Sequence, residues 1–295
     1  MRVNPVLRNE SKISVRSIKF TLMIFAYIAA LSIAVMIYYT SLNSRIFSNG
    51  LDLESSVIFY VVMAIGQALL LLFIVPALSS TAICSEREKQ TLDILLSSKL
   101  TPLQIILGKV SASSLRVIIL IISTMPLYAI GALIGGVKLS NILWLVVFFI
   151  INTIFVSSIG VFVSTYVKTS KAATALTYGL VLLVYIGIIV ITWVIIMVTV
   201  YRMNMAGNYT STVPKASPIV YLSPIVGFVS LLLNQVGSGM GFEYIISEFG
   251  ISAYSEYISI AVQLGLSALF IYLSAIKLNP LKKKKKSKSK KVKEL

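Results

Sequence analysis

Ser85-Glu86-Arg87-Glu88-Lys89-Gln90-Thr91-Leu92-Asp93-Ile94-Leu95-Leu96, residues 85–96, is a charged stretch set between long apolar runs. Ser85 with Glu88 three residues later matches a capping box, in which each side chain binds the backbone amide of the other residue. Glu86 and Glu88 also suit the positive end of a helix dipole. Leu92, Leu95 and Leu96 recur at helical spacing and form one apolar stripe. The stretch therefore predicts amphipathic helical structure that begins at Ser85.

A second helix start follows closely. Thr101 is the predicted cap, Pro102 suits the first turn, and Gln104 closes another capping box. Ser97-Ser98-Lys99-Leu100 interrupts the pattern between the two starts. Residues 79–109 are thus predicted to form a helix–break–helix elbow. This elbow is either a well-made interfacial loop or a docking surface whose charged tip, Glu86-Arg87-Glu88, meets another protein.

The composition sets the class of protein. Of 295 residues, 57% are hydrophobic and only 12% are charged, too few polar groups to cover a soluble domain. Apolar runs long enough to cross about 30 Å of hydrocarbon recur along the chain. We therefore expect an all-α integral membrane protein. The chain has no histidine, which excludes histidine-based acid–base chemistry and histidine metal sites.

Six membrane spans are predicted, and their connections differ in charge. The spans are Thr21–Ser41, Ser56–Leu78, Val110–Leu133, Ile142–Tyr166, Ala172–Val200 and Tyr257–Ile276. An even number of spans places both termini on one side. Of the 26 basic residues, all but Arg45, Lys138, Arg202 and Lys215 fall on that side. The positive-inside rule then places both termini and the elbow in the cytoplasm.

The remaining segments complete the expected organisation, a membrane domain over residues 1–278 and a tail over residues 279–295. Residues 1–20 form either a short interfacial helix or a charged topology signal. Within the irregular region 201–255, prolines and a glycine break the apolar stretch Pro218–Val236, which predicts a re-entrant segment before the sixth span. The lysine-rich tail is too charged to fold alone and suits anionic lipids rather than nucleic acid.

Few ionisable residues lie within the predicted spans. Arg116 either snorkels to the headgroups or lines the inner mouth of a pathway. Gln67 and Asn152 are mid-span polar groups, which most often serve helix–helix hydrogen bonding and otherwise line the pathway with Arg116. Glu256 marks the outer edge of the sixth span. The absence of mid-span acids disfavours a proton- or sodium-coupled carrier and an intramembrane enzyme.

The chain resembles permeases of type-2 ATP-binding-cassette (ABC) transporters. The resemblance rests on Asn4-Pro5-Val6-Leu7, on Ser85-Glu86-Arg87-Glu88 followed by Thr91-Leu92-Asp93-Ile94-Leu95-Leu96, and on Pro102 through Gly108-Lys109. The six-span plan and the broken apolar segment are also similar. The resemblance implies a cytoplasmic ATPase partner, a second permease copy or a paralogue, a connecting helix at residues 1–20, and a coupling helix. The resemblance also implies that nine residues couple the permease to the ATPase: Ser85, Glu86, Arg87, Glu88, Thr91, Leu92, Asp93, Leu95 and Leu96.

No Gly-x-x-x-x-Gly-Lys-Ser/Thr motif occurs in the chain. ATP is therefore expected on the partner subunit, and this chain is expected to be no enzyme and to need no cofactor. The sequence favours a permease subunit in a bacterial plasma membrane, exporting a lipid-like, peptide or amphipathic substrate. The alternative is an ATPase-independent scaffold or sensor that recruits cytoplasmic partners.

Overall fold

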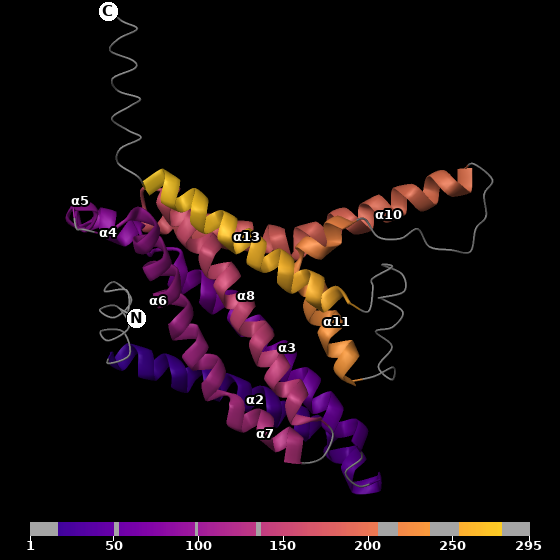
Figure 1. The fold of residues 1–295 in the computed structure, drawn as a ribbon. Helices are drawn as coiled ribbons and strands as arrows, with labels where there is room; N and C mark the ends of the chain where they lie inside the picture. The colour runs from indigo at the N-terminus through magenta and orange to yellow at the C-terminus, as the bar shows by residue number, and fades with distance from the viewer. Residues whose placement is uncertain are drawn as a thin grey trace, which may run out of the picture.

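The computed structural model describes residues 17–49, 53–97, 100–133, 137–205, 218–236 and 254–278, and within these ranges the regular structure is helical. Figure 1 shows the arrangement. The α-helices are α2 (Ile18–Asn49), α3 (Leu53–Ser79), α4 (Cys84–Glu88), α5 (Leu92–Ser97), α6 (Pro102–Ser123), α7 (Met125–Leu133), α8 (Leu139–Tyr166), α9 (Ser170–Leu182), α10 (Ile188–Met205), α11 (Pro224–Val236) and α13 (Ser255–Leu278). A π-helical turn η1 (Leu183–Gly187) joins α9 to α10, and a 3₁₀ turn η2 (Pro218–Leu222) precedes α11.

Six helical stretches within the described ranges are long and apolar enough to cross a membrane. They are Phe20–Ile37, Val57–Glu88, Pro102–Ala129, Leu139–Tyr166, Ser170–Met203 and Ser255–Leu278. Each overlaps one predicted span, so the expectation of an all-α membrane protein with six spanning helices is confirmed. The predicted interfacial helix at residues 1–20 lies almost wholly outside the described residues, and the lysine-rich tail lies entirely outside them.

The helix α8 is the centre of the bundle and packs against α13, α6, α3 and α9. A small residue permits its closest approach to a neighbour. A Cβ atom added to Gly160 would lie 2.7 Å from the Cβ and 3.0 Å from the carbonyl carbon of Ser79 on α3. Helices pack this closely in membranes where small residues let the two backbones approach each other. Gly160 therefore fixes the distance between α8 and α3 near the start of the elbow.

The helix α10 leaves the bundle (Figure 1). It exposes large apolar side chains along its length, among them Trp193 at 51% and Met197 at 50%. An exposed apolar helix surface on a membrane protein faces lipid or another subunit, because water would disfavour it. The α10 surface is thus available to lipid or to a second permease copy.

The apolar segment Pro218–Val236 before the sixth span is interrupted, as its sequence predicts. The turn η2 ends at Leu222, and α11 then runs for only 13 residues from Pro224. A helix of that length rises about 20 Å, short of the roughly 30 Å of hydrocarbon. The observed break agrees with a segment that does not cross, and its return to the outer side stays a prediction.

Substituting Gly160 with alanine should destabilise the protein. The new methyl group would overlap both the side chain and the backbone of Ser79, so a rotamer change alone would not relieve the overlap. The expected loss is about 1–3 kcal/mol of unfolding free energy, measured as a lower midpoint temperature in detergent.

Gly179→Ala on α9 is the matched control, since a Cβ there meets no atom within 4 Å. Alanine favours helix by about 0.5–1 kcal/mol over glycine, so this variant should be as stable as the parent or more stable. Equal midpoints for Gly160→Ala and Gly179→Ala would contradict the close α8–α3 contact.

Candidate functional site

The elbow, residues 79–109, begins as a continuation of α3. After Ser79 the chain keeps turning, and Ser85 and Arg87 donate their backbone N–H groups to the carbonyls of Thr81 and Ile83 at 3.0 and 3.1 Å. The residue before α4 is Ile83, with helical dihedral angles and no capping hydrogen bond from its side chain. The predicted capping box of Ser85 with Glu88 is therefore wrong. The preceding turn already supplies acceptors for these amides, so this helix start needs no serine cap.

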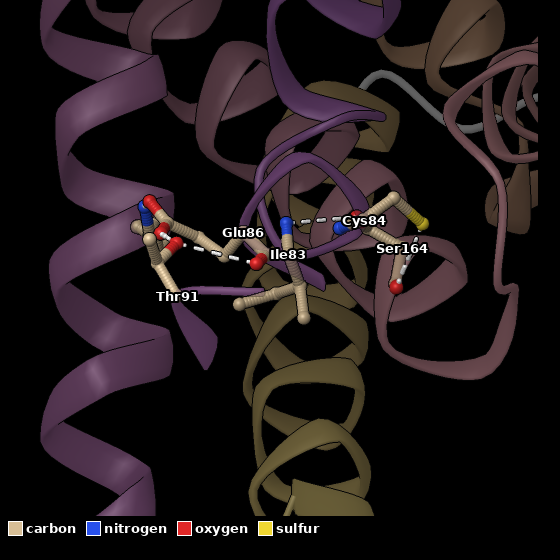
Figure 2. A network of polar contacts seen from close by, with 6 residues as sticks. Ile83, Cys84, Glu86, Thr91 and Ser164 are labelled. Atoms are coloured by element: carbon tan, nitrogen blue, oxygen red, sulfur yellow. Dashed lines mark hydrogen bonds and ion pairs between the residues drawn. The ribbon is translucent and has the colours of Figure 1, made fainter. Parts of the chain in front are cut away.

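The start of α4 docks on the last turn of α8. The hydroxyl of Ser164 accepts hydrogen bonds from the backbone N–H groups of Ile83 and Cys84, both at 2.9 Å. The thiol of Cys84 donates to the carbonyls of Ser164 and Val167, both at 3.2 Å. Figure 2 shows Ser164 beside this turn, with Glu86 and Thr91 on its other side. One buried hydroxyl thus attaches the elbow to the central helix.

Arg87 and Glu88 reach the connection between α8 and α9. The guanidinium of Arg87 donates to the carbonyls of Val167 and Thr165. The carboxylate of Glu88 accepts from the backbone N–H of Ser170 at 2.7 Å and from its hydroxyl at 2.6 Å. Ser170 is the first residue of α9, so Glu88 places negative charge at the positive end of that helix.

Glu86 fastens the elbow to the third span. The ammonium of Lys109, on α6, lies 2.9 Å from one carboxylate oxygen of Glu86, and the Lys109 side chain is only 5% exposed. The hydroxyl of Thr91 donates to the other carboxylate oxygen. A buried ammonium group requires such a partner, because removal from water disfavours its charge.

All three charged residues of the predicted tip, Glu86, Arg87 and Glu88, are therefore engaged within the chain. These bonds hold α4 against α6, α8 and the start of α9. The role of the three residues in binding another protein stays a prediction.

A tight reversal leads from α4 into α5. Gln90 has a positive φ of 58°, while the amides of Gln90 and Thr91 bond to the carbonyls of Arg87 and Glu86 at 3.1 and 2.9 Å. This pattern is a Schellman motif, which ends a helix through a residue in the left-handed region. The reversal turns α5 back towards the start of α6.

The two faces of α5 differ. Leu92, Leu95 and Leu96, the predicted apolar stripe, pack against a buried cluster that contains Ile83, Ile105, Ile106 and Val110. The other face exposes Asp93 and Ile94, the latter at 71%. The second predicted capping box is confirmed: Thr101 and Gln104 bind each other's backbone amides, at 3.0 and 3.3 Å.

The three predicted pathway residues do not form one site. The amide oxygen of Gln67, fully buried on α3, accepts from the hydroxyl of Thr124 at 3.3 Å, at the break between α6 and α7. Asn152 accepts from the hydroxyl of Tyr185 at 2.7 Å and lines an apolar pocket of about 230 Å³ between α3, α8 and α11. Arg116 donates to the Ala112 carbonyl on its own helix at 3.3 Å, away from that pocket.

Sequence reasoning missed three side-chain partners of the elbow, Lys109, Ser164 and Ser170. Lys109 carried a usable signal, because an ionisable residue beside an apolar run requires a nearby partner. Ser164 and Ser170 carried none, since serine is common in membrane helices and both lie about 80 residues from their partners.

These features define a helical membrane protein whose second and third spans are joined by a braced elbow. The chain matches the family described as "ABC-2 family transporter protein" over residues 5–279. It belongs to that family, and so it is a membrane permease subunit of an ABC transporter, a class that works with an ATP-binding-cassette ATPase. A comparison with curated proteins gives no match.

Removing one partner of the Glu86–Lys109 pair should destabilise the protein more than removing both. Glu86→Gln removes a carboxylate from a buried ammonium group, whereas Glu86→Gln with Lys109→Met removes both charges of the pair. We expect Glu86→Gln to lose about 2 kcal/mol of unfolding free energy. This loss is smaller than for a fully buried pair, because the Glu86 side chain is 28% exposed and solvent screens its charge.

The measurement is a double-mutant cycle on unfolding midpoints in detergent. Asp93→Asn, an exposed acid on α5, is the control and should leave the midpoint unchanged. Additive effects of Glu86→Gln and Lys109→Met would show that the two side chains do not interact.

Proposed function

We propose that α5 is the coupling helix of this permease and that its exposed face docks on a separate ATP-binding-cassette ATPase. The observation that carries the proposal is that α5 has an exposed face while its neighbour α4 is hydrogen-bonded to several spanning helices. Ile94 is 71% exposed on α5, while the adjoining helix α4 is bonded to α6, α8 and α9. A displacement of the elbow by the ATPase would reach three spanning helices at once.

Charge supports a cytoplasmic location for this end of the bundle. The elbow, the starts of α6 and α9 and the ends of α8 and α13 lie together there, as their hydrogen bonds and shared apolar cluster indicate. This end carries Lys89, Lys168, Lys171 and Lys277, and the ammonium of Lys277 lies 4.9 Å from the centre of the Tyr166 ring. The positive-inside rule therefore favours the cytoplasm for the elbow and for both termini, with a bacterial plasma membrane as the expected location.

The proposed cargo is lipid-like, peptide or amphipathic, and the proposed direction is export. Two apolar pockets along α3 and α11 share the lining residues Ile65, Phe228 and Val229. Apolar pockets suit an acyl chain or another apolar group. ATP is bound by the partner chain in this proposal, so the permease itself holds no cofactor.

Two further partners belong to the proposal. A second permease copy or a paralogue would cover part of the exposed apolar surface of α10. Anionic lipids would attract the lysine-rich tail at residues 279–295, and no role with nucleic acid is proposed. No observation specifically favours the ATPase-independent scaffold.

A single-cysteine cross-link tests the docking. Cys84 is the only cysteine of the chain, and Cys84→Ser retains a hydroxyl donor for its two carbonyl acceptors. In that background, Ile94→Cys carrying a photo-activated cross-linker should join the permease to the P-loop ATPase that co-purifies with it, because this position is exposed on α5.

Leu139→Cys is the control, since Leu139 is 65% exposed at the opposite end of α8. It should give no ATPase adduct. Cross-linking from position 139 instead of position 94, or the absence of a co-purifying ATPase, would overturn the proposal and favour the scaffold.

A further inference from the structure

A pocket of about 490 Å³ with both polar and apolar lining residues lies at the end of the bundle opposite the elbow. The start of α8, the end of α11 and the start of α13 form its walls, with Asn141, Trp144, Gln235, Glu256 and Tyr257 among the lining residues. About 26 Å of α8 separates Val147, the lining residue nearest to the elbow on this helix, from Ser164, at 1.5 Å rise per residue. The distance along α8 between these two regions can be followed in Figure 1. The pocket is therefore a separate site from the elbow.

Glu256 is the unusual group in this pocket. It is 6% exposed, and no described residue forms a hydrogen bond or an ion pair with its carboxylate. It lies in the first turn of α13, where the helix dipole supports negative charge. A carboxylate that lines a pocket and has no partner among the described residues suits a cationic ligand.

The other walls supply what an organic cation requires. The rings of Trp144 and Tyr257 lie 5.8 Å apart between centroids, inclined at 41°, and aromatic faces attract ammonium groups. The indole N–H of Trp144 is buried and has no acceptor among the described residues. A ligand that carries an oxygen near its ammonium group would satisfy the carboxylate and the indole together.

The pocket is poorly suited to a metal ion. No group of three His, Cys, Asp or Glu side chains that could hold a metal occurs in the described part of the chain. The amides of Asn141 and Gln235 are engaged in donating to each other's backbone carbonyls, at 3.3 and 3.0 Å, and Gln235 also accepts from the hydroxyl of Tyr60. These bonds fix α8 to α11 and hold the pocket walls in place. Lys138, the nearest cation in sequence, is exposed at the cap of α8 and does not line the pocket.

We propose that this pocket binds the ammonium group of an amino alcohol, free or as a lipid headgroup, between the Glu256 carboxylate and the rings of Trp144 and Tyr257. The ammonium is held by charge and by the aromatic faces, and the neighbouring oxygen accepts from the Trp144 indole. Binding here needs no ATPase, so this proposal and the proposed function fail separately.

The test is equilibrium binding of tritiated choline to the full chain in nanodiscs of phosphatidylglycerol. We expect saturable binding that is about tenfold weaker for Glu256→Gln and for Tyr257→Leu. Tyr272→Leu is the matched control: Tyr272 is an exposed tyrosine on the same helix, about 22 Å from Tyr257 along its axis. Choline binding to this variant should be unchanged.

A second readout reports on the indole itself. Trp144 and Trp193 are the only tryptophans, so Trp193→Phe leaves Trp144 as the sole tryptophan. Choline should change the tryptophan emission of this variant with the same dissociation constant. Nanodiscs of phosphatidylcholine separate the two sources, since a lipid headgroup that reaches the pocket would weaken choline binding there, and free choline alone would bind equally in both.

Three results would overturn the proposal. The first is unchanged choline binding by Glu256→Gln that retains the helical content and elution volume of the parent. The second is equal competition by 3,3-dimethyl-1-butanol, which has the shape of choline without its charge. The third is equal displacement by sodium or potassium chloride at the same concentration, which would indicate a site for an inorganic cation.

Discussion

The ion pair between Glu86 and Lys109 is the interaction on which the arrangement of the elbow depends. Lys109 is 5% exposed beside an apolar run of α6, where an unpaired ammonium group would be strongly disfavoured. Its carboxylate partner Glu86 is on α4, so the pair holds α4 beside α6. Thr91 binds the same carboxylate, and the reversal at Gln90 then directs α5 back over the apolar cluster around Ile105 and Ile106.

This constraint explains why the connection between α3 and α6 differs from an ordinary turn. The link between α8 and α9 is short, and it leaves polar backbone groups at Thr165, Val167 and Ser170 that need partners. Arg87 and Glu88 supply them, so the elbow completes the polar contacts of a link about 80 residues away in sequence. The elbow is therefore part of the bundle, with one exposed face on α5, and a force applied there would act on several spans.

The parts of the structure that were predicted correctly depend on local sequence. The six spans follow from long apolar runs, the Leu92–Leu96 stripe from helical spacing, and the Thr101–Gln104 box from a start that follows a real interruption of the helix. The Ser85–Glu88 box matched the same local pattern but failed because the chain arrives from α3 already turning. Glu88 instead binds Ser170, a distant residue that no local rule identifies.

The candidate sites also differ in whether they depend on local sequence or on contacts between distant residues. Gln67, Asn152 and Arg116 have separate hydrogen-bond partners in Thr124, Tyr185 and Ala112, and their part in a pathway stays a prediction. Glu256 was identified as an ionisable residue at the edge of a span, but its aromatic neighbour Trp144 is more than 100 residues away in sequence. Only the packing of α8 against α13 brings the two residues into one pocket.

The central claim is that the exposed face of α5 meets the ATPase. Hydrogen exchange of the permease, alone and in complex with its ATPase, tests this claim most directly. The account predicts slower exchange over residues 89–97 in the complex, with unchanged exchange over residues 139–147 at the far end of α8. Equal exchange over residues 89–97 in the two states, or protection confined to the far end, would contradict it.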